Sequence, residues 1–410
     1  MRWLLTENKK GDEQGTRMPK RRCDERYGSC TEEPRQQQHL YLVLDDWRYG
    51  YTIRKVELPL HSGEDAEQSL PRPFFRFVAK HELPHFFTSA FGTRIIAMHT
   101  MDSTGAVPVI DISTRSVIFG PQYNYPVKPI YFPIGNKLFA LDSGTFEFCR
   151  CPRGDGLPLG QPHAESGGMF FDGDDEWSWV QIRMPFRRRH VTSYAVHSDG
   201  QTILISTKSD AAAATFTFDT VKREWKCLGD WALPFTGRGH YDGKLEALVG
   251  LSEDPKTLGC LYSCKLPGAN SGSRQCPAPA WKLSKERVFS TNPAERHVGA
   301  TLVYMGRRAR FCLVECVCLE VKAEDNSGEA SSDQVLLKGD NSGEGNSDQV
   351  LLKKSGGGPE RSRYMYRLMT FVLKYDKMED LRVKCCRVRY YNVPKKASPE
   401  FGENPAAFWL

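Results

Sequence analysis

Short runs of β-branched and aromatic residues, separated by turn-forming residues, recur along the chain from His39 onwards. The first pair of runs is 40–44 (LYLVL) and 51–58 (YTIRKVEL), and the turn segment 45–50 (DDWRYG) lies between them. Apolar runs of this kind are typical of strands, and breaks rich in Gly and Asp are typical of hairpin turns. No amphipathic helical pattern of normal length appears, so the chain is predicted to be all-β.

The clearest unit spans residues 192–228, where four short β-rich runs are separated by turns and the last run begins at Trp225. Comparable groups recur at intervals of about 40–50 residues, a spacing typical of propeller blades. A four-stranded sheet with two apolar faces cannot bury either face alone, so neighbouring sheets stack around an axis. We therefore predict a kelch-like β-propeller of six blades, with seven as the alternative, in which the N-terminal strands close the ring beside the C-terminal ones. A two-layer β-sandwich is the rival architecture, but a single sandwich rarely needs about 350 residues of strands.

Two recurring residue types support the blade interpretation. A large indole ring near the end of a unit can fill the wedge between neighbouring blades. An aspartate that ends a strand can accept hydrogen bonds from the backbone of the following turn. The tryptophans are Trp179, Trp225 and Trp281, and the aspartates are Asp111, Asp219 and Asp376.

Composition shifts divide the chain into a propeller domain with two insertions and two flanking segments. The domain is expected to span residues 39–397. Residues 1–38 are polar and basic and are predicted to form a disordered arm, and 398–410 a C-terminal tail. The insertions, 153–176 and 322–361, are polar and rich in Gly, and they are also predicted to be disordered.

Several segments together resemble a plant family of kelch-like proteins that is expanded in grasses and has no known function. The segments are 193–200 (SYAVHSDG), 215–220 (TFTFDT), 229–235 (GDWALPF), 239–251 and 40–46. The resemblance covers about residues 39–397, implies a propeller-like fold and brings no catalytic residues. The paired glycines that true kelch repeats carry after the second strand of each blade are missing here. The pairs that the chain has, in 167–168 and 356–358, lie in the insertions.

Composition excludes several other classes of protein. Hydrophobic residues make up 40% of the chain, charged residues 26%, and the mean hydropathy is -0.50. These values exclude a membrane protein, a collagen-like fibre and a wholly disordered chain. The 13 cysteines lack regular spacing and are interpreted as reduced thiols in a cytoplasmic or nuclear protein. Residues 18–22 (MPKRR) resemble a short nuclear-import signal.

A compact basic run lies between two predicted blades. Arg187, Arg188, Arg189 and His190 directly follow residues 184–186 (MPF). On an inter-blade loop, such a run can contact an acidic protein segment or a phosphate backbone. We assign it as the candidate partner-contact loop. A solvated loop without a function is the simpler interpretation.

No set of residues carries a recognisable catalytic or metal-binding pattern. The close cysteine pairs 149/151, 260/264 and 316/318 are not followed by a matching histidine pair, so buried thiols explain them better than zinc. His197 and Asp199 could form a base with its orienting acid, but residues 198–200 (SDG) are better explained as a hairpin turn. Phosphate-binding glycine loops are also missing from the sequence.

These observations favour a non-enzymatic protein-interaction module that presents loops on a propeller scaffold. We expect a protein partner, and no catalytic residues, cofactor, metal or membrane contact. Nucleic acid is the less favoured partner. The alternatives are a nuclear protein with weak basic contacts to nucleic acid, and a hydrolase or oxidase that uses a propeller pocket.

Overall fold

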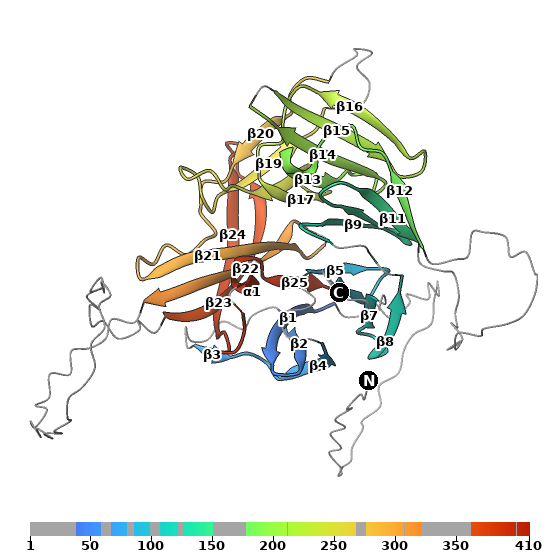
Figure 1. Ribbon diagram of the computed structural model, residues 1–410. Helices are drawn as coiled ribbons and strands as arrows, with labels where there is room; N and C mark the ends of the chain where they lie inside the picture. The colour runs from blue at the N-terminus through green and yellow to red at the C-terminus, as the bar shows by residue number, and fades with distance from the viewer. Residues whose placement is uncertain are drawn as a thin grey trace, which may run out of the picture.

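The structure is a computed structural model that describes most of the chain (Figure 1). The described residues are 38–58, 67–79, 86–98, 107–121, 123, 126–150, 178–210, 212–267, 276–306, 308–320, 362–398 and 400–410. The predicted arm, its basic segment 18–22 and both predicted insertions lie outside the described residues, apart from residue 38 at the end of the arm.

The described strands form six antiparallel groups of four, named here blades 1 to 6, and the parallel pairing of β13 with β17 joins blades 4 and 5 into one eight-stranded sheet. Blade 1 contains β25 (Ala406–Trp409), β1 (Leu40–Trp47), β2 (Gly50–Val56) and β4 (Pro73–Val78). Blade 2 contains β5 (Phe86–Ala90), β6 (Arg94–Met98), β7 (Val107–Asp111) and β8 (Ser116–Gly120). Blade 3 contains β9 (Ile130–Ile134), β10 (Lys137–Leu141), β11 (Phe146–Arg150) and β12 (Trp179–Ile182).

The other three blades follow the same plan. Blade 4 contains β13 (Val191–Val196), β14 (Thr202–Lys208), β15 (Ala213–Asp219) and β16 (Glu224–Gly229). Blade 5 contains β17 (Gly237–Asp242), β18 (Ala247–Leu251), β19 (Leu261–Lys265) and β20 (Ala280–Leu283). Blade 6 contains β21 (Glu295–Tyr304), β22 (Arg310–Glu320), β23 (Ser362–Tyr375) and β24 (Leu381–Asn392). In each blade the first strand named is the innermost one, and Figure 1 shows the outer strands β8, β12 and β16 at the periphery.

Six hydrophobic clusters join the six blades pairwise into a closed ring. Each cluster lies between two neighbouring blades, and together they cover the pairs 1–2, 2–3, 3–4, 4–5, 5–6 and 6–1. Strand β1 shows how the sequence achieves this arrangement. Leu40, Leu42 and Leu44 belong to the cluster with blade 6, whereas Tyr41 and Val43 belong to the cluster with blade 2. Both faces of the strand are apolar, so both are buried. The ring confirms the predicted all-β, six-bladed propeller.

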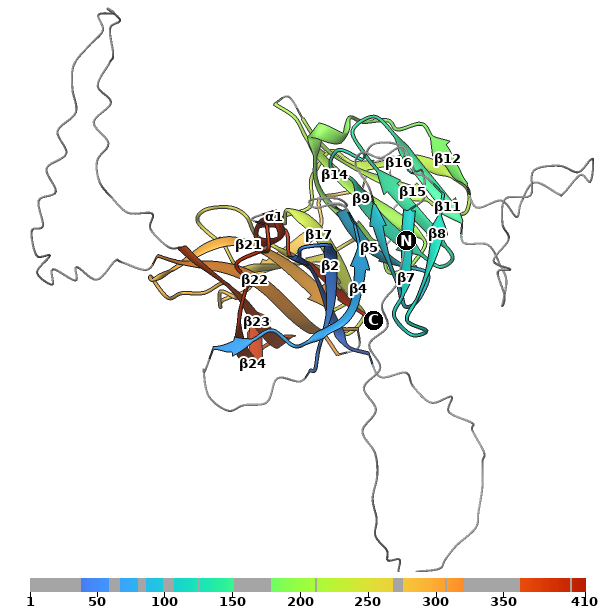
Figure 2. The ribbon, with the colours of Figure 1, turned by 60° about the horizontal axis from the view of Figure 1, so that its bottom comes forward.

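The end of the chain closes the ring. β25 pairs antiparallel with β1, from Leu40 opposite Trp409 to Val43 opposite Ala406. The backbone of His39 exchanges hydrogen bonds of 2.7 and 3.0 Å with Leu410. Residues 398–410 therefore do not form a separate tail: they contribute the short helix α1 (Glu400–Glu403) and the innermost strand of blade 1. Figure 2 shows blade 1, with β2 and β4, between blade 6 and β5 of blade 2.

A second connection joins blades 1 and 6. The two-residue strand β3 (Gln68–Ser69), which lies between β2 and β4 in the chain, pairs in parallel with the end of β24. Leu70 follows it and is buried in the cluster between these two blades. The ring is thus closed both at its inner edge and at its outer edge.

The aspartates that end strands cap turns as predicted. Oδ1 of Asp219 accepts hydrogen bonds of 2.9 Å from the backbone N–H groups of Val221 and Lys222. Asp111 and Asp376 accept equivalent bonds from the turns that follow them. These turns end the third strand of blades 2, 4 and 6.

The tryptophan prediction is confirmed at two positions and wrong at the third. Trp225 packs in the cluster between blades 3 and 4, and Trp179 in the cluster between blades 2 and 3. Trp281 is instead 55% exposed and contacts the ring of Tyr262. It lies on the outer strand β20, opposite Cys264 of the cluster between blades 4 and 5, but at the rim of the ring, where solvent reaches it.

This difference predicts the stability of two alanine variants. The Trp225 ring lies 4.8 Å from that of Phe218 and 5.1 Å from those of Phe146 and Phe186. Trp225→Ala is expected to lower the free energy of unfolding by about 1.5–3 kcal/mol, because it removes a packed side chain from the interface. Trp281→Ala is expected to change it by less than about 0.5 kcal/mol. Denaturant unfolding of both variants measures the difference, and equal losses would contradict the wedge role.

Candidate binding site at the arginine loop

The loop of residues 183–190 (RMPFRRRH), named here the arginine loop, joins the outer strand of blade 3 to the innermost strand of blade 4. Met184 and Phe186 pack against the cluster between these blades. The Phe186 ring lies 5.2 Å from Phe216 and 5.1 Å from Trp225. Two apolar anchors thus hold the loop on the ring, and Arg183 before them and Arg187 after them remain at the surface.

The four residues of the predicted contact loop have different surroundings. Arg188 to His190 form a short 3-10 helix before β13. Arg187 and Arg189 are exposed, and Nε of Arg189 donates a hydrogen bond to Nε2 of His190 at 3.2 Å. Arg188 is half-buried, and its Nη2 donates to the carbonyl oxygen of Lys128 at 2.9 Å. Burial lowers the pKa of Arg188, while Tyr194 and Asp142 act in the opposite direction.

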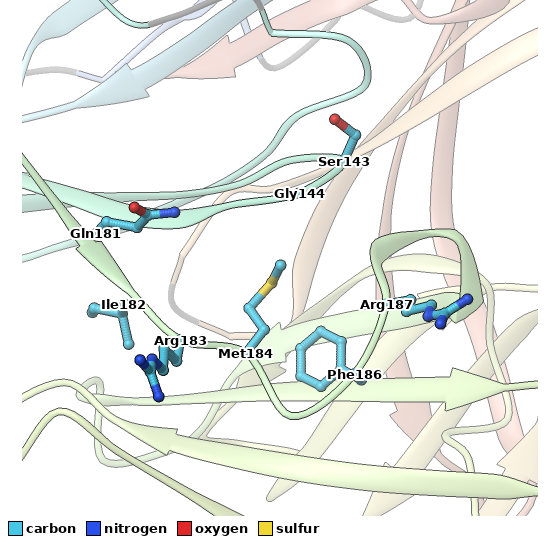
Figure 3. Close-up of a pocket in the computed structure, with 8 residues that line it drawn as sticks. All are labelled: Ser143, Gly144, Gln181, Ile182, Arg183, Met184, Phe186 and Arg187. Atoms are coloured by element: carbon cyan, nitrogen blue, oxygen red, sulfur yellow. The ribbon is translucent and has the colours of Figure 1, made fainter.

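An open pocket of about 600 Å³ lies beside the arginine loop (Figure 3). Its wall is formed by the turn after β10 and by the end of β12 with the first half of the loop. The lining residues are Ser143, Gly144, Gln181, Ile182, Arg183, Met184, Phe186 and Arg187. The volume is within the range of pockets that hold small ligands or one or two side chains of a partner.

The pocket has two cationic ends and an apolar middle. In Figure 3, Arg183 and Arg187 lie at opposite ends, and Met184 and Phe186 lie between them. Both arginines are exposed. Within the part of the chain that the structure describes, neither guanidinium has a hydrogen-bond or ion-pair partner. Two unpaired guanidinium groups on either side of an apolar surface suit a ligand with two negative groups.

The sequence analysis singled out one of these pocket residues, Arg187, and missed the others. Arg183 and Arg187 are four residues apart, with Pro185 between them. This pair of arginines around an apolar segment is the sequence feature that could have indicated the pocket. Ser143 and Gly144 are about 40 residues earlier in the chain and reach the pocket only because β10 and β12 belong to the same blade.

The other candidate residues have structural roles. Asp199 caps the hairpin turn: its Oδ1 accepts hydrogen bonds of 2.8 Å from the backbone N–H groups of Gln201 and Thr202. Burial acts to raise the pKa of Asp199, but these bonds and the one from the Thr202 hydroxyl lower it overall. His197 lies 3.3 Å from Asp199 in this exposed turn.

The described cysteines of the predicted pairs are mostly core residues. Cys260, Cys264, Cys316 and Cys318 are buried. Burial raises the pKa of the Cys264 and Cys316 thiols to about 12, which disfavours the thiolate form that binds metals. Among the described residues, no three His, Cys, Asp or Glu side chains lie close enough to hold a metal ion. No described helix is long and apolar enough to cross a membrane.

The strand order and the closed set of interfaces define a β-propeller, with a surface pocket at the connection between blades 3 and 4. Residues 37–386 match a family described as "Protein of unknown function (DUF1668)", and the chain belongs to this family. No curated protein matches the chain.

Solved structures with a similar arrangement are distant in sequence. A putative 6-phosphogluconolactonase from Bacteroides uniformis is 10% identical, with a TM-score of 0.40, and the match covers 91% of this chain and all of that one. A β-propeller domain, Cps50 (Swd1) from Myceliophteria thermophila, is 11% identical, with a TM-score of 0.31 and coverage of 57% and 81%. A structural-genomics protein of unknown function from Bacteroides thetaiotaomicron is 9% identical, with a TM-score of 0.35. The match covers 69% of this chain and spans only 61% of that protein.

Proposed function

We propose that the protein is a non-enzymatic recognition module that binds an acidic segment of a protein partner in the pocket at the arginine loop. The observation that carries the proposal is the position of two guanidinium groups, Arg183 and Arg187, on either side of Met184 and Phe186, without a partner among the described residues. An acidic segment with an apolar residue between two carboxylates would pair with both arginines and cover the apolar surface.

The surrounding chemistry supports recognition over turnover. Arg188 is already bonded to the Lys128 carbonyl group and fixes the loop that carries Arg187. Among the described residues, those that line the pocket include no acid, histidine or cysteine to serve as a base or nucleophile. We further propose a cytoplasmic or nuclear location, because the described cysteines form no disulfide. We also propose kinship with the plant kelch-like proteins that the central blade resembles.

Defined peptides test the proposal. We expect a fluorescent peptide with two acidic clusters around one phenylalanine to bind the full chain, and its lysine counterpart not to bind. Arg183→Glu/Arg187→Glu is expected to weaken binding about 10–100-fold or more, since each charge-assisted hydrogen bond contributes about 1.5–3 kcal/mol. Fluorescence anisotropy measures the Kd.

A matched variant controls for net charge. Lys226 and Lys244 are also exposed, and they lie outside the pocket. Lys226→Glu/Lys244→Glu makes the same change in charge and is expected to alter the Kd less than about threefold, through screened long-range effects. Equal losses in the two double variants would show nonspecific attraction and contradict the proposal. So would tighter, salt-dependent binding of an RNA oligonucleotide than of any peptide.

A further inference from the structure

Two cysteines that follow each other in the chain lie at the surface of blade 6. Cys385 and Cys386 belong to β24, the outermost of the four strands β21 to β24 (Figure 2). Both thiols are free and exposed. On its outer side β24 pairs only with β3, at Tyr391 and Asn392, so no described strand covers the edge of β24 beside the two cysteines. Small molecules in solution can therefore reach the pair.

The strand is irregular at these two cysteines. In a regular strand, successive side chains point to opposite faces of the sheet, which separates neighbouring thiols. The pairing of β24 with β23 shifts by one residue between Thr370 and Val372, so that Cys385 and Cys386 together lie opposite Phe371. This arrangement of two residues against one is a β-bulge, and it interrupts the alternation between faces.

The backbone of Cys385 adopts a conformation that favours glycine. Its φ is +55°, in the left-handed region, which is costly for a residue with a side chain. Among the described residues with a side chain, the others with a positive φ lie in the connections between strands, whereas Cys385 lies inside a strand. Strained residues of this kind are retained mostly at functional sites, and here the strained residue presents a thiol to solvent.

Positive charges flank the two thiols. Lys384 precedes them and Arg387 follows them in β24. Neighbouring cations favour the thiolate, which is the reactive form of cysteine, and attract reagents that carry carboxylates. Burial nevertheless raises the pKa of the Cys386 thiol, and Glu286 contributes in the same direction. Cys386 is therefore mostly protonated near pH 7, and the first attack on a reagent is assigned to Cys385.

We propose that Cys385 and Cys386 form a redox site that small disulfides of the glutathione type oxidise. In the first step, the Cys385 thiolate attacks one sulfur atom of glutathione disulfide and forms a bond to it. The other glutathione leaves as a thiolate and takes up the proton that Cys385 has lost. In the second step, the Cys386 sulfur attacks that of Cys385, and the second glutathione leaves with the proton of Cys386. Two electrons thus pass from the two protein thiols to glutathione disulfide, which yields two glutathione molecules.

A bond between these two cysteines would be easily reversed. Neighbouring Cα atoms are about 3.8 Å apart, whereas cysteines joined by an ordinary disulfide are about 4.4–6.8 Å apart. The small ring that closes is therefore strained, and strained, exposed disulfides are readily reduced. The pair suits reversible oxidation better than cross-linking of the fold. The site lies in blade 6 and does not depend on the function proposed for the arginine loop.

Treatment of the reduced full chain with glutathione disulfide tests the site. After alkylation of the remaining thiols, peptide mass spectrometry is expected to show the wild-type pair joined by a disulfide and without bound glutathione. Dithiothreitol should restore both thiols. Cys386→Ser is expected to keep one glutathione on Cys385, because no neighbouring thiol displaces it. Cys385→Ser is expected to bind glutathione more slowly, since the remaining thiol is mostly protonated.

Cys227 provides a matched control. It is an exposed cysteine on β16 without a cysteine next to it in the chain. In the same wild-type sample it is expected to retain glutathione, and Cys227→Ser is expected to leave the bond between Cys385 and Cys386 unchanged. All three serine variants change exposed side chains and are expected to keep the wild-type Tm in reducing buffer. The proposal is overturned if glutathione stays on the wild-type pair as it does on Cys227, or if both thiols of the pair stay free when Cys227 is fully modified.

Discussion

Replacing Glu315 with alanine is expected to lower the free energy of unfolding by about 3–5 kcal/mol, because the change leaves a buried guanidinium without its counter-ion. Glu315, on β22, is 0% exposed and lies opposite Arg367 on β23, which is 8% exposed. Oε2 of Glu315 accepts a hydrogen bond of 3.0 Å from Nη1 of Arg367. Urea unfolding, followed by far-UV circular dichroism, measures the loss.

The rest of the cluster explains why this pair should matter more than a surface pair. The backbone N–H group of Ser290 donates to Glu315 at 3.0 Å, and Nδ1 of His297 lies 2.9 Å from its Oε1. The His297 ring stacks on Phe289 with 4.1 Å between centroids. The carboxylate thus joins strands of blade 6 to the segment that enters the blade, and its loss breaks several bonds at once.

An exposed ion pair of the same type provides the control. Nζ of Lys282 lies 3.0 Å from Glu379, whose side chain is 83% exposed. Glu379→Ala is expected to cost no more than about 1 kcal/mol, because water screens the pair. Glu315→Leu/Arg367→Met is expected to recover part of the loss, since it removes both charges. If Glu315→Ala costs no more than Glu379→Ala, the buried pair does not hold the blade together.

The strands of blade 4 were predictable because their signals are local. The unit predicted over residues 192–228, with four short runs, coincides with the four observed strands β13 to β16. Alternation along each run and the aspartates that cap the first and third turns, Asp199 and Asp219, involve residues only a few positions apart. Each predicted sheet has two apolar faces, so it has to pack against a neighbouring sheet on both sides. A set of sheets that all pack in this way closes into a ring.

The closure and the binding surfaces depend on residues far apart in the chain. Residues 406–409 (AAFW) are too few to show a strand pattern, and they become a strand because β1 offers an unpaired edge more than 360 residues earlier. The pocket needs Gly144, in the turn after β10, to line the same space as Arg187, which lies about 40 residues later in the chain. Arg183 and Arg187 were visible in the sequence, but their position at the two ends of one pocket exists only once blades 3 and 4 have stacked.

Deleting residues 404–410 is expected to prevent stable folding, because the deletion removes one strand of blade 1 and opens two interfaces. Ala407 is 8% exposed and belongs to the cluster with blade 6, against which Trp409 also packs. Phe408 and Leu410 pack against the cluster with blade 2. Losing one large core side chain costs about 3–5 kcal/mol, and whole domains are stable by only about 5–15 kcal/mol. The truncated chain is therefore expected to lose cooperative unfolding and to aggregate through the free edge of β1.

A point variant tests the same closure without shortening the chain. Ala407→Asp places a charge in the interface between blades 1 and 6 and is expected to lower the Tm strongly, because a buried unpaired carboxylate must be desolvated or protonated. Met378→Asp, at a side chain that is 82% exposed, introduces the same residue and is expected to leave the Tm nearly unchanged. A synthetic peptide of residues 400–410 should restore cooperative unfolding to the truncated chain when it is added during refolding. If the truncated chain unfolds at the wild-type Tm, β25 does not close the ring, and the six interfaces are stable without it.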